Sequence, residues 1–132
     1  MDTREIIDLF KEKGLKATPQ RIAVYNFLVE NPVHPDVETV YQSMIMDNPS
    51  FSKTTVYNCL QALTDCGLLI PVKIDNEKIR YDADTSFHGH FKCDCCGRIY
   101  DFKCFDEKVS GIDNFKIKQR DVYYSGLCSC CI

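Results

Sequence analysis

Cys93-Asp94-Cys95-Cys96-Gly97 and Cys128-Ser129-Cys130-Cys131 hold six of the nine cysteines of this chain. Each stretch contains two cysteines with two residues between them, Cys93 with Cys96 and Cys128 with Cys131. Such a pair presents two thiolates to one side of a metal ion, and two pairs complete the tetrahedral shell that zinc prefers. A shell of four thiolates leaves no open position for a substrate. We therefore expect a structural zinc ion that links the last strand of a small domain to its first hairpin.

Two alternatives to this ligand set stay open. Cys95 and Cys130 lie inside the same two stretches and could exchange with the assigned ligands, although the spacing favours the paired arrangement. A set of free buried thiols would also account for the cysteines, but it would require them to cluster by chance.

Length and composition limit the class of protein. The chain has 132 residues, 45% of them hydrophobic and 27% charged, which is typical of one folded domain or two small ones. No apolar run reaches the ~18 residues of a membrane span, and the first ten residues lack the apolar stretch of a signal peptide. We expect a cytoplasmic protein with no membrane partner, in which nine cysteines indicate metal binding or redox chemistry rather than disulfides.

Charge and cysteine usage change near Pro71. Residues 1–71 carry six Lys/Arg and nine Asp/Glu, whereas residues 72–132 carry ten of each and seven of the nine cysteines. The overall charge of −3 argues weakly against non-specific nucleic-acid binding. An average charge hides local patches, so the positions of the charged residues must show whether the chain binds nucleic acid. This asymmetry predicts two domains, residues 1–82 with a hinge near their end and residues 83–132.

The first domain is predicted to contain four helices and a hairpin. Gly14 ends the first helix. Thr18 caps the second helix, and Pro19 occupies its first position. Ser52 caps the fourth helix, which runs to Cys66. The third helix is predicted to start at 34–35 and to stop before Asn48. Apolar residues at helical spacing supply the buried faces: Ile6, Ile7, Leu9, Phe10, Ile22, Ala23, Val24, Phe27, Leu28, Val37, Val40, Tyr41, Met44, Val56, Leu60 and Leu63. Residues 68–74 and 78–82 alternate around a turn and predict a β-hairpin.

This order of elements is typical of a winged-helix DNA-binding domain, with the fourth helix as the recognition helix. Its predicted exposed side chains offer a cation, hydroxyl and amide groups, and an aromatic edge, as docking in the major groove requires. The candidate DNA-binding residues are Lys53, Thr54, Tyr57 and Asn58, with Gln61 on the same face and Lys16, Arg21 and Lys13 as phosphate or minor-groove contacts. An ordinary polar helix face with scattered surface cations remains the alternative.

Histidines and aspartates supply a second set of candidate metal ligands. In a strand, residues two apart point to the same face, so His88 and His90 would face one ion. Asp82 ends the preceding hairpin, and Asp101 lies in a strand, residues 98–102, that would return antiparallel. Taken alone, a His-x-His pattern is also explained by two surface histidines.

Several motifs in order resemble the ferric uptake regulator family over nearly the whole chain. They are Gly14-Leu15-Lys16-Ala17-Thr18-Pro19-Gln20-Arg21, His34-Pro35, Thr55-Val56-Tyr57-Asn58, His88-Gly89-His90, Cys93 with Cys96, Asp101-Phe102, and Cys128 with Cys131. The resemblance implies an α+β fold with a winged helix and a small C-terminal α/β dimerisation domain. It also implies a homodimeric repressor that binds double-stranded operator DNA under the control of a regulatory metal.

Within that family the chain is most similar to the peroxide-sensing branch. The resemblance implies a regulatory Fe(2+) or Mn(2+) site beside the structural Zn(2+), with ligands at His34, Asp82, His88, His90 and Asp101. Iron-sensing members commonly place Glu at the position of Asp82. Hydrogen peroxide is the implied signal, acting through Fe(2+)-catalysed oxidation of a ligand histidine that releases the operator.

Other functions remain as alternatives. The chain could respond to iron, manganese or zinc availability instead of peroxide. A cysteine-based redox switch could use Cys59, Cys66, Cys95, Cys104 or Cys130. A metal-dependent hydrolase is disfavoured because no His-Glu-x-x-His pattern occurs and the predicted zinc shell is closed. We therefore expect no enzyme activity and assign no catalytic residue.

Overall fold

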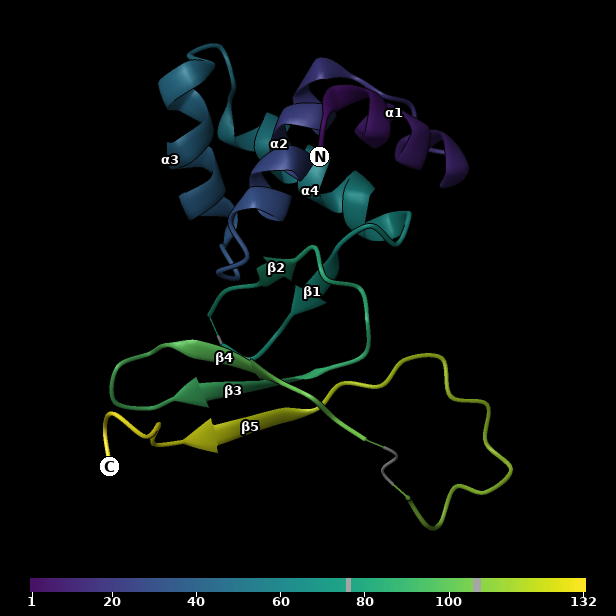
Figure 1. The fold of residues 1–132 in the computed structure, drawn as a ribbon, viewed down its shortest axis with the longest axis vertical. Helices are drawn as coiled ribbons and strands as arrows, with labels where there is room; N and C mark the ends of the chain where they lie inside the picture. Colours follow the sequence, from purple (N-terminus) through teal and green to yellow (C-terminus); the bar gives the residue numbers. More distant parts are fainter. Residues whose placement is uncertain (76, 106–107) are drawn as a thin grey trace. The chain divides into compact units, whose positions relative to one another are not determined.

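The computed structural model describes residues 1–75, 77–105 and 108–132 and has an α+β fold. The chain divides into two compact units, residues 1–85 and residues 86–132 (Figure 1). The first unit holds four helices and a two-stranded sheet, and the second holds a three-stranded sheet.

Each helix of the first unit begins at a side chain that caps it. The caps are Asp2, Thr18, Asp36 and Ser52, and each accepts a hydrogen bond from the backbone N–H three residues further on. Such caps satisfy donors that have no partner inside the helix. The helices are α1 (Thr3–Glu12), α2 (Pro19–Glu30), α3 (Val37–Asp47) and α4 (Lys53–Asp65). The predicted caps of the second and fourth helices are confirmed.

The core of this unit is formed where the four helices pack together. Its fully buried side chains are Ile6, Phe10, Val24, Leu28, Val40, Val56, Leu60 and Leu63, together with Leu69 just beyond α4. Cys59 is also buried on α4, between the predicted apolar positions. Burying the faces of α2 and α4 leaves the opposite face of α4 exposed to solvent.

The predicted start of the third helix is wrong. His34 has a backbone φ of 58°, in the left-handed region, and α3 begins only at Val37. The preceding segment pairs with the hairpin instead, since the Tyr81 N–H donates to the Pro35 carbonyl (3.0 Å) and Asp36 forms a bridge with Arg80.

The hairpin is shorter than the sequence predicted. Strands β1 (Ile70–Val72) and β2 (Arg80–Asp82) are antiparallel, with Ile70 opposite Asp82. Leu68 and Leu69 do not join the strand, because both are buried and their N–H groups donate to the Leu63 carbonyl at the end of α4.

The sheet of the second unit has the strand order β4-β3-β5. β3 (Gly89–Cys93) and β4 (Ile99–Phe102) are antiparallel, as predicted, whereas β5 (Tyr123–Gly126) runs parallel to β3. β3 begins at Gly89, so His88 precedes the strand rather than lying in it.

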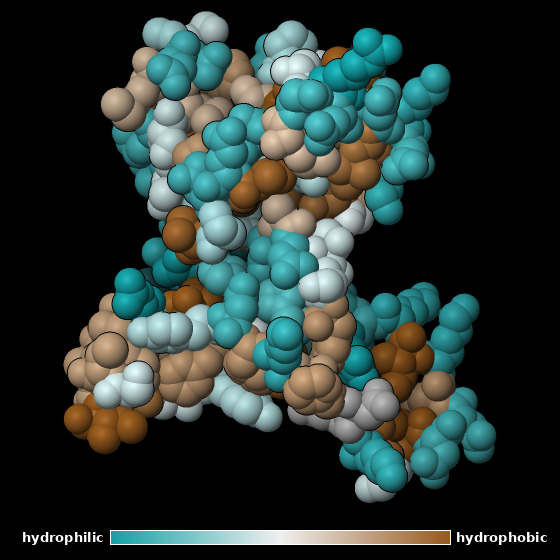
Figure 2. Space-filling view, in the orientation of Figure 1, coloured by the Kyte–Doolittle hydropathy of each residue, from teal (hydrophilic) through white to brown (hydrophobic). Residues whose placement is uncertain are grey.

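The expected helix of a C-terminal α/β domain is absent from the described residues of 86–132, where every regular element is a strand. The described part of the connection from β4 to β5 is irregular, and its turn-forming residues explain this: Ser110, Gly111 with a φ of 94°, Asp113 and Asn114. Exposed apolar side chains accompany it, among them Phe105, Val109, Phe115 and Ile117, and Figure 2 shows brown surface around this connection.

No helix within the described ranges is both long enough and apolar enough to span a membrane.

Candidate functional site

The two cysteine pairs of the second unit meet in one cluster. Cys93 ends β3, and the following turn, which needs Gly97 at a φ of 73°, brings Cys96 back beside it. Cys128 and Cys131 lie in a second turn after β5, where the Cys131 N–H donates to the Cys128 carbonyl (2.9 Å). The four Sγ atoms lie within 4.8 Å of one another, close enough to bind one metal ion. Cys95 and Cys130 are exposed and stand outside this group.

The pKa values of the four cluster thiols shift in both directions: those of Cys93 and Cys128 are lowered, and those of Cys96 and Cys131 are raised. The backbone N–H groups of Cys128 (3.4 Å) and Cys96 (3.5 Å) both point at the Cys93 sulfur and lower the pKa of that thiol to about 6. The Tyr100 hydroxyl lowers the pKa of Cys128 in the same way. A hydrogen bond with the Cys128 side chain raises the pKa of Cys131 instead.

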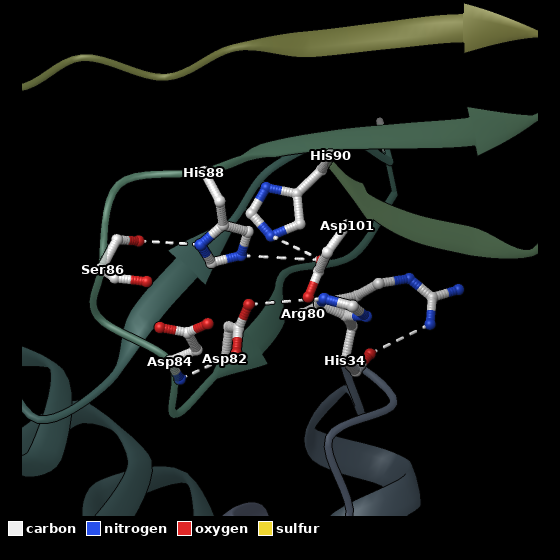
Figure 3. Close-up of polar contacts among 8 residues, drawn as sticks. All are labelled: His34, Arg80, Asp82, Asp84, Ser86, His88, His90 and Asp101. Carbon is white, nitrogen blue, oxygen red and sulfur yellow. Dashed lines mark hydrogen bonds and ion pairs between the residues drawn. The ribbon is translucent and has the colours of Figure 1, made fainter. Parts of the chain in front are cut away.

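The first unit holds His34 and Asp82 as a buried pair. His34 Nε2 lies 3.4 Å from Asp82 Oδ2, and both residues are 5% exposed (Figure 3). Asp82 ends β2, and its Oδ1 accepts a hydrogen bond from the Asp84 N–H (2.9 Å). The left-handed backbone at His34 costs about 1–3 kcal/mol, a strain that the surrounding contacts must hold in place.

The second unit brings His88, His90 and Asp101 together. His90 on β3 stands opposite Asp101 on β4, and Asp101 Oδ1 lies 3.4 Å from His90 Nε2 and 3.6 Å from His88 Nε2. The two imidazole rings are 4.5 Å apart, and His88 Nδ1 faces the Ser86 carbonyl at 2.7 Å (Figure 3). Two imidazole nitrogens beside one carboxylate oxygen form a nitrogen and oxygen donor group for a metal ion.

Glycine is required at position 89, between the two histidines in sequence, because a side chain there would meet the ring of Phe102. A Cβ at Gly89 would lie 2.2 Å from the Phe102 ring on the opposite strand. That ring is stacked on Tyr124, with centroids 4.8 Å apart, so it has little room to move.

Arg80, Asp75 and Tyr100 are contributors that the sequence reasoning missed. Arg80 touches the backbone of His34, Asp75 touches Arg80, and Tyr100 touches a cysteine thiol. Strand alternation could have found Arg80, since it lies two residues before Asp82 and therefore on the same face of β2. No sequence signal pointed to Asp75.

The predicted DNA-binding residues lie on and beside the exposed face of α4. Lys53, Thr54, Tyr57, Asn58 and Gln61 are all exposed, as predicted for this helix. Lys53 forms an ion pair with Glu38 of α3, which raises the pKa of the lysine. Lys16 and Arg21 line a cleft of about 320 Å³ next to α4, together with Thr18, Gln20, Thr55, Asn58 and Cys59. The burial of Cys59 raises the pKa of its thiol, although Arg21 opposes this effect.

Comparison with known proteins agrees with these features. The model of the ferric uptake regulator family matches residues 12–125. The chain belongs to this family. A relative from Bacillus subtilis (strain 168), named peroxide operon regulator, is 30% identical over an alignment of 135 positions. The alignment covers 98% of this chain and 93% of the relative.

Two solved structures of family members are similar to the present one. The ferric uptake regulator of Helicobacter pylori, described as having three functional metal binding sites, matches with a TM-score of 0.75 at 21% identity, over 99% of this chain and 94% of that one. The Streptococcus pyogenes PerR, whose structure is described as a basis for peroxide sensing and gene regulation, matches with a TM-score of 0.56 at 26% identity, over 98% and 92% of the two chains.

Proposed function

We propose that this family member is a homodimeric, metal-dependent transcriptional repressor that hydrogen peroxide releases from double-stranded operator DNA. The observation that carries the proposal is the set of donors: His34 with Asp82 in one unit, and His88 with His90 and Asp101 in the other. The names of the Bacillus subtilis and Streptococcus pyogenes relatives support peroxide as the signal.

The donor chemistry fits two different metals. Three imidazoles and two carboxylates suit Fe(2+) or Mn(2+), whereas the cluster of Cys93, Cys96, Cys128 and Cys131 suits a structural Zn(2+). Fe(2+), when bound, would supply the electrons that cleave peroxide and so produce an oxidant beside the ligand imidazoles, which Mn(2+) does not readily do.

The ligands themselves would couple sensing to DNA binding. We assign residues 1–82 to a winged-helix domain with the β1–β2 hairpin as its wing and a hinge near its end, and residues 83–132 to dimerisation. His34 and Asp82 would then hold the ion from the DNA-binding side of the hinge, and His88, His90 and Asp101 from the other side. An oxidised imidazole is a weaker ligand, so its loss would free the hinge and lower DNA affinity.

The exposed face of α4 would read the operator. Tyr57, Asn58 and Thr54 are exposed on α4 and would contact bases, while Lys53, Lys16 and Arg21 would supply charges for phosphates. Two such domains in a cytoplasmic dimer can span half-sites about one helical turn apart.

The direct test measures operator binding of the metal-free, Fe(2+) and Mn(2+) forms, each before and after a peroxide pulse. We expect both metals to support binding and peroxide to abolish it only in the Fe(2+) form, with added oxygen on His34, His88 or His90 by peptide mass spectrometry. A protein that binds DNA with metal but ignores peroxide would be a regulator of metal availability. Oxygen on cysteines alone, with loss of binding, would establish a thiol switch instead.

A further inference from the structure

His34 lies in a short segment that β2 holds in an unusual conformation. Pro35 disfavours the right-handed helical conformation at His34, and the observed φ of 58° is one that few non-glycine residues adopt. The backbone of 35–36 is tied to β2 through the Tyr81 N–H (3.0 Å) and the Asp36–Arg80 bridge. These bonds fix the residues after His34, but they leave the carbonyl of His34 itself to be held by another group.

The Arg80 side chain holds that carbonyl. Its Nη1 donates to the His34 carbonyl oxygen at 3.1 Å, and its Nε donates to Asp75 Oδ2 at 2.6 Å (Figure 3 draws the contact with His34). The guanidinium is planar and rigid, so an anchor at Nε also fixes the direction of Nη1. The side chain of Arg80 is 19% exposed and that of Asp75 8%, which protects the pair from water.

Arg80 and Asp82 share one strand face, so a single short strand positions both members of the buried pair. Asp82 presents its carboxylate directly, and Arg80 acts on His34 through the backbone. We infer that Arg80, oriented by Asp75, is a positioning residue that presets His34 for metal binding. This inference rests on the proposed function, because it assumes that His34 is a ligand of the regulatory metal.

The test measures the Mn(2+) affinity of the zinc-loaded full chain, following free Mn(2+) by electron paramagnetic resonance. Removing a residue that orients a metal ligand typically costs 10–100-fold in affinity, and we expect Arg80→Gln to lose at least about tenfold. Lys78→Gln is the matched control. It removes one positive charge from the same hairpin, and its partner is the Asp36 carboxylate (3.4 Å) rather than the His34 carbonyl, so affinity should stay within about twofold of the wild type.

A double-mutant cycle separates positioning from general damage to the fold. If Arg80 acts through His34, Arg80→Gln should cause little further loss in a His34→Ala background. Asp75→Asn keeps Arg80 but weakens its anchor, so it should lower affinity in the same direction by a smaller factor and provides the test if Arg80→Gln does not fold.

The outcomes distinguish the inference from the function on which it rests. If His34→Ala binds Mn(2+) weakly but Arg80→Gln keeps wild-type affinity, the positioning role is overturned and the function stands. The same holds if Arg80→Gln lowers Mn(2+) affinity by the same factor in the wild-type and His34→Ala backgrounds. Wild-type affinity in His34→Ala overturns both, because His34 would then not be a ligand.

Discussion

Tyr57 is the exposed aromatic residue at the centre of the proposed DNA-reading face, with 48% of its surface accessible. Tyr57→Ala should weaken binding to the operator by about 1–3 kcal/mol, the usual cost of losing recognition at one base pair, and should change binding to random DNA little. Lys16→Ala is the comparison, since loss of a phosphate contact should weaken both and reduce the salt slope by about one. Competition assays with operator DNA and random DNA would measure both affinities. If Tyr57→Ala lowers the two affinities equally, Tyr57 does not read bases.

Cys96 tests the ligand assignment of the four-thiol cluster. Cys96→Ser should release zinc and destabilise residues 86–132, because metal binding supplies folding free energy to a small sheet. Cys104→Ser should keep full zinc, since Cys104 lies outside the cluster. Metal analysis and thermal unfolding under reducing conditions provide the measurement. Full zinc in the Cys96 variant would show that Cys95 or Cys130 takes its place.

Among the helices and strands, α3 carries a cap whose charge should make stability depend on pH. Burial would raise the pKa of Asp36, but hydrogen bonds from Thr39 and the Lys78 ammonium outweigh burial and lower it. A lowered pKa means stability that is present above the unfolded-state pKa of about 3.9 and is lost as the pH falls through the folded-state value.

Asp36→Asn isolates this contribution, because Asn caps a helix about as well as Asp but carries no charge. At pH 7 we expect the wild type to be more stable by about 0.3–1 kcal/mol, the usual value of an anion at a helix N-terminus. Urea unfolding at pH 7 and at pH 3 would measure the difference. A gap that persists unchanged at pH 3 would contradict the assignment to the charge.

The elements also show where sequence reasoning succeeds. The positions of Thr18 with Pro19 and of Ser52 could be predicted, because a cap depends on a few neighbouring residues. The start of α3 could not, since it depends on contacts between His34–Asp36 and a strand more than 40 residues away. The same applies to the site. The antiparallel pairing of His90 with Asp101 could be predicted from the sequence, whereas His88 lies before β3 and not in it. Asp75 acts through a chain of contacts that only the folded structure contains.

For the molecule as a whole, the proposed mechanism requires access of peroxide to a metal held by five protein ligands. Asp101→Glu should preserve metal-dependent operator binding but slow oxidation, because a longer carboxylate that could bind through both oxygens would compete with peroxide for a bound ion. The rate of oxygen addition to ligand histidines in the Fe(2+) form is the measurement, with the Mn(2+) form as the unreactive control. If Asp101→Glu is oxidised at the wild-type rate and still binds DNA, the length of the carboxylate side chain at position 101 does not control the access of peroxide.

The order of the cysteine pairs along the chain has a consequence for a protein that has been cut. One pair precedes β4 and the other follows β5, so the segment that connects these strands lies between the two halves of the cluster. A protease that cuts this connection once would leave two fragments, each with two of the four cluster cysteines. One fragment would carry β3 and the other its partner strand β5. The fragments should remain associated through the shared ion and the parallel strand pair, and a chelator should separate them.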